Sequence, residues 1–244
     1  MQWYYIYWRE MLLLYKKIGK LGYIFSSIMM PLLYLFAFGL GLGGRDITGG
    51  NYVEFLAKGI IGITVMMNAF QQTSLSVSIG RFYFGTFQTV ILSPIKNWQI
   101  IFGLSLAGVV RGMLMGFVVY GVAWMFFDIS SISPLAVLAI FISAFCFSAL
   151  GLVVGLYVNN PDALSLVNNF LLMPMTLFCG SFFPITNLPA WIGSIIEKLP
   201  LSIVNSLVRT DVLGPSVWQD ISILILIGLA CLWLGTNMLT RYSE

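Results

Sequence analysis

The chain has 244 residues, 59% of them apolar and only 9% charged, whereas roughly 25% of the residues in a soluble globular protein carry a charge. This composition excludes an ordinary soluble domain, which could not cover its surface with polar groups. It indicates one membrane domain spanning residues 1–244. The net charge of +3 is too small to suggest a nucleic-acid partner.

Several kinds of chemistry are excluded by residues that the sequence lacks. It has no histidine and only scattered cysteines, which excludes a histidine-dependent catalytic triad and a transition-metal site. It has no phosphate-binding loop ending in GK[ST], so the chain does not hydrolyse ATP by that route. The three cysteines lie in apolar runs without metal-site or disulfide spacing, and we expect them to be buried: Cys146, Cys179 and Cys231.

The first 20 residues predict an amphipathic helix in the membrane interface. At about 100° per residue, Gln2, Arg9, Lys16 and Lys20 share one face, and aromatic and aliphatic side chains spread around the rest. The rings then lie at headgroup depth, and the cations face the cytoplasm. The helix is either a topology anchor alone or also part of a docking surface for a cytoplasmic partner. The residues concerned are Trp8, Arg9, Lys16 and Lys17.

Six continuously apolar segments are long enough to cross a hydrocarbon core of about 30 Å, which takes about 20 helical residues. They predict an all-α protein with six transmembrane helices, because the strands of a β-barrel would alternate in polarity. The predicted spans are about 23–42, 59–79, 100–127, 135–158, 163–183 and 221–239. About twenty residues, many of them aromatic or basic, precede the first span, and no small-residue cleavage site follows it, so we expect it to remain in the mature protein.

Lysine and arginine residues set the predicted orientation. Six spans place both termini on one side, and that side carries seven of these residues: Arg9, Lys16, Lys17, Lys20, Arg81, Lys96 and Arg241. The other side carries four: Arg45, Lys58, Lys198 and Arg209. Both termini are therefore predicted to be cytoplasmic.

The cytoplasmic loop after the second span, RFYFGTFQTVILSPIKNWQ, mixes polar residues with apolar ones. A plain connection would be shorter and more polar. Phe87, Val90 and Ile91 share one face of a predicted short helix, which Ser93-Pro94 would end. Such a helix either inserts into a groove on a partner or lies on lipid, and the sequence leaves both readings open.

Prolines break the external segment 184–220 into pieces too short to span a membrane. Two short amphipathic helices are predicted, one over 191–199 and one over 203–208, and we expect them to fold back into the outer leaflet. Irregular backbone at that depth needs protein or water around it. The segment therefore forms the outer mouth of a pathway, or an external cap with no gating function.

Glycines recur at helical spacing in the third and fourth spans. Gly108, Gly112 and Gly116 lie four residues apart, and Gly151 and Gly155 repeat the interval. Small residues at this spacing let helices approach closely, so we expect these glycines to serve packing.

Arg111 lies beside the first glycine series, where a cation is costly because it is within the membrane. No acidic residue lies deep in any apolar run, so the sequence offers Arg111 no obvious ionic partner. The side chain either snorkels to the cytoplasmic interface or faces a wet crevice or an anionic substrate on a transport pathway. The scarcity of intramembrane acids argues against an ion-driven transporter.

In their order and spacing, these segments resemble the permease subunits of the type-2 ABC exporter family, which includes drug-resistance, nodulation-factor and polysaccharide export permeases. The amphipathic start leads into a span with Pro31 and LFAFGLG, and YVEFLAKGI opens the second span, where the family often has proline in place of Lys58. RFYFGTFQTVILSPI resembles the family's segment after the second span. The most specific match is PMTLFCGSFFPITNLPAWI followed by LPLSIVNSLVR.

The resemblance implies a bacterial inner-membrane exporter built from two permease copies, identical or closely related, each docked to a cytoplasmic ABC ATPase. No cofactor is implied in this chain, and ATP and Mg would bind the ATPase. The segment Arg81–Ile95 would be the coupling helix, through Arg81, Phe84, Gly85, Thr86, Phe87, Gln88, Val90, Ile91, Pro94 and Ile95. The external helices would form an outer gate, through Phe178, Phe182, Phe183, Pro184, Leu188, Pro189 and Trp191.

Within this family an amphipathic small molecule or a lipid-like molecule is the favoured substrate, and a polysaccharide or glycolipid is the alternative. A function of another class, a membrane scaffold or channel without an ATPase, would explain the hydropathy equally well. It would not explain the apolar helical face of the cytoplasmic loop. A membrane enzyme is disfavoured because no convergent set of catalytic residues stands at either interface.

Overall fold

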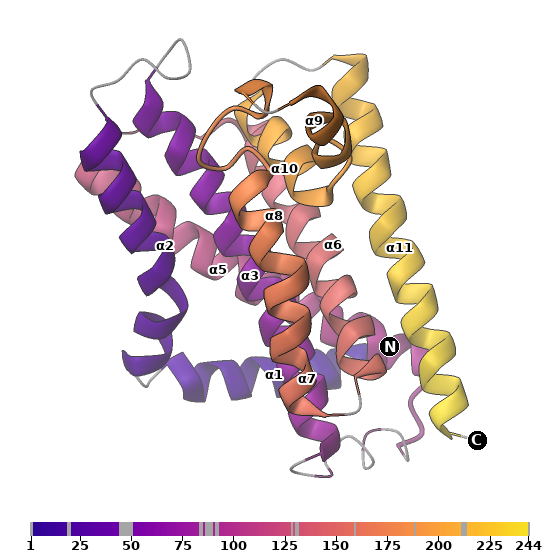
Figure 1. Cartoon of the computed structure of the whole chain (residues 1–244). Coiled ribbons are helices and arrows are strands. Elements are labelled where there is room, and N and C mark those ends of the chain that lie inside the picture. The colour runs from indigo at the N-terminus through magenta and orange to yellow at the C-terminus, as the bar shows by residue number, and fades with distance from the viewer. Residues whose placement is uncertain are drawn as a thin grey trace.

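The computed structural model describes residues 2–18, 21–43, 51–82, 85, 90, 93–127, 129, 132–158, 160–187, 189–210 and 214–243. Over these residues the chain is helical and contains no strand, as the sequence predicts. Long helices run side by side as a bundle, and α1 (Trp3–Ile18) lies crosswise at one end of it (Figure 1).

Among the described residues, five helices are long and apolar enough to cross a membrane. They are α2 (Leu21–Leu42), α3 (Tyr52–Phe82), α5 (Asn97–Phe127), α6 (Pro134–Tyr157) and α11 (Pro215–Ser243). Helix α3 begins at Tyr52 rather than at 59. Its polar first turns are stabilised by the Asn51 side chain, which accepts the Val53 N–H at 3.0 Å, and by an ion pair of 3.1 Å between Glu54 and Lys58.

The segment predicted as the fifth span consists of three consecutive helical pieces. They are α7 (Pro161–Val167), the π-helix η1 (Asn168–Leu172) and α8 (Met173–Phe178), which follow one another as a single rod in Figure 1. Pro174 has no N–H for the Phe170 carbonyl, and a π-turn just before a proline is one way to accommodate that loss. The apolar helical stretch of this rod, Ala163–Phe178, is shorter than the five spans named above.

The helix ends at Phe178 rather than at the predicted 183. Cys179 leaves helical geometry, and Gly180 has a φ of +74°, which an L side chain adopts only with strain. The hydropathy of CGSFF is that of a span, whereas its backbone turns back toward the bundle. The prediction of the fifth span was therefore wrong in its last five residues.

Two short helices and a 3-10 turn gather at the end of the bundle opposite α1 (Figure 1). They are η2 (Ile185–Asn187), α9 (Ala190–Ile196) and α10 (Pro200–Arg209). Helix α10 is amphipathic, with Leu201, Val204 and Leu207 buried and Ser206 exposed. Short helices are therefore present at both of the predicted positions, and their place outside the membrane stays a prediction.

Helix α3 is the centre of the bundle. Its most apolar stretch is 72% buried, against 17% for α2 and 28% for α11, because α5 and α6 pack on it from two sides. The glycines make this possible. A Cβ at Gly112 would lie 2.9 Å from the Ala69 Cβ, and one at Gly155 would lie 2.8 Å from the Ser74 carbonyl oxygen. The predicted packing role of the glycine series is confirmed.

Gly151→Ala should destabilise the protein by about 1–3 kcal/mol, because the added Cβ meets the Phe70 backbone of α3 and forces the two helices apart. Gly121→Ala is the matched control, since nothing lies within 4 Å of its Cβ position, and alanine favours the helix by up to about 1 kcal/mol. Melting temperatures of the two variants in one detergent provide the comparison. Equal melting temperatures would show that the α3–α6 contact tolerates a methyl group.

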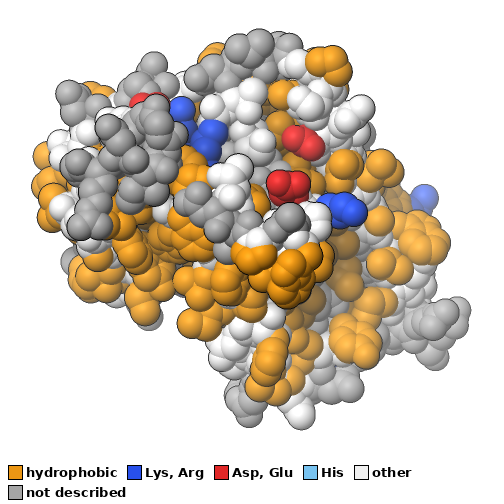
Figure 2. All heavy atoms as spheres, turned by 45° about the horizontal axis from the view of Figure 1, so that its top comes forward, with side chains coloured by type: hydrophobic (Ala, Val, Ile, Leu, Met, Phe, Trp, Pro, Cys, Tyr) orange, Lys and Arg blue, Asp and Glu red, His pale blue; other side chains and the backbone are white. Residues whose placement is uncertain are grey.

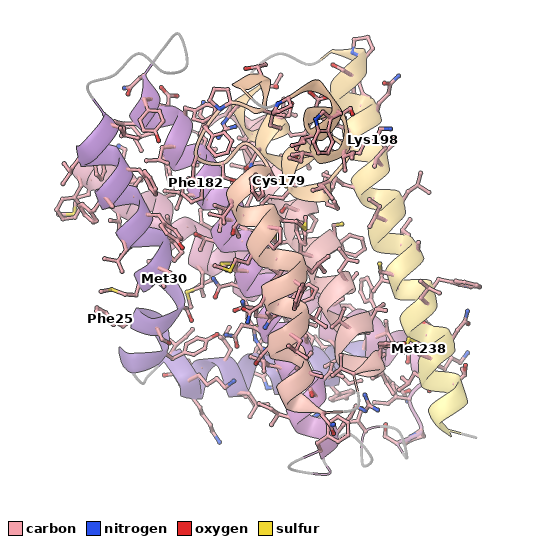
Figure 3. All side chains as sticks on the ribbon, in the orientation of Figure 1. Phe25, Met30, Cys179, Phe182, Lys198 and Met238 are labelled. Carbon is pink, nitrogen blue, oxygen red and sulfur yellow. The ribbon has the colours of Figure 1, made fainter. Side chains whose placement is uncertain are left out.

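The flank of the bundle is apolar. In Figure 2 hydrophobic side chains cover much of the visible side, while the charged side chains in that view gather toward the end of the bundle that is turned forward. Outward-facing residues of α2 include Phe25 and Met30, which project away from the bundle in Figure 3. This distribution is that of a protein whose sides contact lipid.

Candidate functional site

Helix α1 is attached to the bundle by a buried ion pair. Arg111 of α5 donates from Nη2 to the Glu10 carboxylate at 2.7 Å and to the Glu10 carbonyl at 3.2 Å. Ser76 of α3 donates to the same carboxylate oxygen at 2.9 Å. The side chains of Arg111 and Glu10 are only 4% and 3% exposed. One carboxylate thus joins three helices in a site closed to solvent.

The sequence analysis found no ionic partner for Arg111, and this was wrong. The apolar runs hold no such acid, because the partner comes from the segment predicted to lie in the interface, 101 residues earlier. A usable signal was present, because Ile6, Glu10 and Leu14 recur every fourth residue and place Glu10 in the middle of an apolar face. Any contact of Arg111 with substrate stays a prediction.

The cationic residues predicted on α1 are not part of this pair. Arg9 and Lys16 lie on the side of the helix turned away from it. Lys17 is closer, with its Nζ 5.8 Å from the centroid of the Tyr23 ring. Partial burial and the nearby Arg111 lower the pKa of Lys17, and Glu10 opposes them. Trp8 is half exposed.

The Arg81 side chain holds the end of α6. Its Nη1 donates to the carbonyls of Gly155, Leu156 and Val158 at 3.0, 2.6 and 3.3 Å. These are orphan carbonyls at a helix C-terminus, where a cation is also favoured by the helix dipole. Arg81 therefore has a structural role in joining α3 to α6, whatever its part in coupling.

Other residues of the predicted coupling segment fall into two groups. The first group is described by the structure. In it, Val90 and Ile95 are partly buried and pack against a set of buried residues that we call the lower cluster. Pro94 is exposed, and Gly85 has a φ of +58°. The lower cluster consists of Ile6, Val77, Ile100, Ile101, Leu104, Leu152, Leu156 and Leu239. The remaining predicted residues lie outside the described part of the chain: Phe84, Thr86, Phe87, Gln88 and Ile91.

At the other end, three side chains hold the turn 179–183 that follows α8. Arg209 donates to the carbonyls of Gly180 at 2.7 Å and of Phe55 at 3.0 Å. Its guanidinium carbon also lies over the Phe55 ring, 3.5 Å from the ring centroid. Asn205 donates to the Cys179 carbonyl and to the Ser181 hydroxyl, both at 2.8 Å. The Tyr52 hydroxyl donates to the Phe182 carbonyl at 3.1 Å.

We call these contacts of Arg209, Asn205 and Tyr52 with the turn the clamp, and the sequence analysis did not predict them. Arg209 was counted only as an external charge, and Asn205 was not singled out. The two residues lie four apart on α10, so they share the face turned toward the turn. Because their acceptors are backbone carbonyls, no pattern of side chains in the turn indicates the contact.

The predicted gate residues lie in different environments. Phe182 is buried, and its ring centroid lies 5.3 Å from that of Tyr34 and 5.2 Å from that of Phe38, both on α2. Phe178 and Trp191 are exposed. Figure 3 shows Phe182 and Cys179 at the end of α8 nearest α9. Of the others, Phe183 and Pro184 are partly buried, Pro189 is exposed, and Leu188 lies outside the described residues.

The described residues contain no group of three or more His, Cys, Asp or Glu side chains that would hold a metal ion. The three cysteines are buried and unpaired, as the sequence predicts. The polar chemistry of the described site is therefore that of hydrogen bonds and one ion pair, which suits the positioning of helices.

Comparison with known proteins identifies the family. Residues 1–213 match the family model described as ABC-2 type transporter. The inner membrane transport permease YadH of Escherichia coli K12 is 29% identical over 208 residues, covering 82% of this chain and 80% of the relative. Nodulation protein J of Rhizobium leguminosarum biovar viciae is 28% identical over 239 residues, covering 93% and 87%. Nodulation protein J of Neorhizobium galegae is 26% identical over 237 residues, covering 93% and 86%. With a match over most of its length, the chain belongs to the ABC-2 type transporter family and is an integral membrane protein related to transport permeases.

Proposed function

We propose that this chain is the membrane-spanning subunit of an ATP-driven exporter, with six membrane crossings and both termini in the cytoplasm. The observation that carries the proposal is the family match over residues 1–213. It is supported by a bundle with two different ends, one closed by α1 and the lower cluster and the other by the clamped turn and α10.

The sixth crossing is the rod from α7 to α8. Residues 161–178 are helical throughout, and 18 helical residues extend about 27 Å, close to the thickness of a hydrocarbon core. In Figure 1 the rod runs the height of the bundle, from the end that holds α1 to the end that holds α9. With this crossing, α1 and the end of α11 lie on one side, which the lysine and arginine distribution assigns to the cytoplasm.

A second permease copy is the proposed neighbour of the exposed face of the rod. Ser165 and Asn169 are exposed on the rod, beside the exposed apolar side chains of Leu166 and Phe170. An amide or hydroxyl at this depth is costly against lipid, so protein or water is the more favourable neighbour. The π-helix at Asn168–Leu172 lies on the same rod, and π-turns occur frequently at functional sites.

The cytoplasmic partner is an ABC ATPase, which the segment 81–95 would contact. We expect an ATPase subunit to co-purify with the chain in detergent, and we expect Phe87→Asp or Ile91→Asp to reduce the recovered ATPase at least tenfold, because a charge would replace an apolar anchor. Trp191→Asp is the matched control at the opposite end, where the side chain is exposed. Unchanged recovery and coupling in both Phe87 and Ile91 variants would refute the coupling assignment.

The proposed substrate is an amphipathic small molecule or a lipid-like molecule. The alternative is a polysaccharide or glycolipid, which exposed rings such as Phe170 and Phe178 on the rod would accommodate by stacking. Stimulation of ATP hydrolysis in the reconstituted pair separates the two, with amphipathic compounds and oligosaccharides tested in parallel. Stimulation by oligosaccharides alone would favour the alternative.

A further inference from the structure

We propose that the outward face of α1 binds an anionic phospholipid, with its phosphate between Arg9 and Lys16. The proposal rests on the proposed placement of α1 at the cytoplasmic membrane surface. It adds a specific lipid site to a helix that the sequence indicates only as an anchor or a docking surface.

The site is a shallow groove along α1. It has a volume of about 290 Å³ and is lined by Tyr5, Trp8, Arg9, Leu12, Leu13 and Lys16. Trp8, Leu12 and Leu13 are 50%, 47% and 41% exposed, an unusual density of apolar surface for a helix of 16 residues that is already packed on one side.

The Glu10–Arg111 pair determines which face of α1 points outward. Ile6, Glu10 and Leu14 are buried against the bundle, so the helix cannot rotate without breaking the ion pair. At about 100° per residue, Arg9 and Lys16 lie within about 20° of one another, and Trp8 and Leu12 lie on the neighbouring sector. The outward face therefore has an apolar sector next to a cationic sector, which matches the acyl chains and the anionic headgroup of a lipid at the membrane interface.

The cations of the groove are not neutralised by the described residues. Glu10 is the only acidic residue among the first 20, and its carboxylate is engaged by Arg111 and Ser76. Neither Arg9 nor Lys16 forms an ion pair within the described part of the chain, whereas Lys58 pairs with Glu54. A site with two cations and no counter-charge calls for an anionic ligand.

The apolar lining selects a phospholipid over free phosphate. Arg9 and Lys16 are two turns apart, about 10.5 Å along the axis, and their long side chains can converge on a phosphate above Leu12 and Leu13. The glycerol and upper acyl carbons would then contact Trp8 and Leu12. A free phosphate ion would leave this apolar surface in water, and a zwitterionic lipid would bring a cation to the two that are already there.

The test measures lipid binding to the purified chain. Native mass spectrometry with added phosphatidylglycerol should show that Arg9→Gln/Lys16→Gln weakens binding roughly 10- to 30-fold, since each cation near an anionic lipid contributes about a fivefold change in affinity. The matched control is Lys96→Gln/Lys198→Gln, which removes the same charge from exposed positions elsewhere and should leave binding unchanged. Melting temperatures of both double variants, which should equal that of the parent chain, show that the fold is retained.

Further measurements distinguish an anionic phospholipid from the other possible ligands of the groove, which are a zwitterionic lipid, free phosphate and a protein. Phosphatidylcholine should bind the parent chain and Arg9→Gln/Lys16→Gln equally, and 10-fold excess inorganic phosphate should not displace phosphatidylglycerol. Equal phosphatidylglycerol affinity in the parent and Arg9→Gln/Lys16→Gln would overturn the proposal. So would loss of ATPase co-purification in that variant without any change in lipid affinity, which would make the groove a protein-docking face. These readouts do not depend on export, so their failure is separable from failure of the proposed function.

Discussion

Glu10→Gln should lower the stability of the protein by about 3 kcal/mol, one of the largest effects of any single charge change in the chain. The substitution keeps the shape of the side chain but leaves the Arg111 guanidinium buried without a counter-charge. Breaking a buried pair by removing one partner typically costs about 3–5 kcal/mol, because the remaining charge is desolvated and unpaired. For a chain of this length, that corresponds to a fall in melting temperature of about 6–12 °C.

The double variant separates pairing from packing. In Glu10→Gln/Arg111→Gln both charges are absent, so most of the lost stability should return, since the net contribution of a buried pair is small once both members are replaced. Glu197→Gln, which removes an exposed acid at the opposite end, is the control and should not change the melting temperature. If the double variant melts as low as Glu10→Gln, packing rather than unpaired charge is the cause.

The position of this pair shows where the sequence analysis was sufficient and where it failed. Hydropathy predicts the spans because each depends on a local run of apolar residues, and the glycine series predicts the α3 contacts because small residues serve close packing. Glu10 and Arg111 are separated by 101 residues and meet only because α1 packs against α5. No local pattern contains that information, although the face shared by Ile6, Glu10 and Leu14 indicates that the carboxylate is inward.

The helix ends were the other weak point. Hydropathy locates the edge of the apolar region, but a helix ends where its backbone hydrogen bonds end. For α3 the helix begins before the apolar region does, because Tyr52 and the ion pair of Glu54 and Lys58 extend the helix into polar sequence. For α8 the helix ends before the apolar region does, because the carbonyls of the apolar CGSFF turn accept hydrogen bonds from Asn205 and Arg209 on α10. Side chains from another helix satisfy that backbone, so the turn itself carries no polar signal.

Arg209→Met should open the turn 179–183 and make Cys179 reactive. The guanidinium donates to the partly buried carbonyls of Gly180 and Phe55 and, at 3.4 Å, to that of Ser181, and bonds from a charged donor are worth about 1.5–3 kcal/mol each. Methionine fills a similar volume but donates no hydrogen bond, so the Gly180 carbonyl loses its charged donor and the Phe55 carbonyl, which lies within α3, loses the donor that it has from outside its own helix. The free energy of local opening should fall by about 2–3 kcal/mol, which raises the population of the open turn at least tenfold.

Cys179 reports this opening directly, because it is fully buried in the closed turn and its carbonyl accepts the Asn205 amide. With Cys146 and Cys231 replaced by alanine, a membrane-impermeant maleimide applied to intact cells should label Arg209→Met at least ten times faster than the parent, and Asn205→Ala should be labelled faster too. Lys58→Met removes a cation of similar size from a partly exposed pair at the same end and should stay protected. Labelling of Arg209→Met at the parent rate would show that α10 does not hold the turn closed. Labelling only after the cells are permeabilised would place this end of the bundle in the cytoplasm and reverse the proposed orientation.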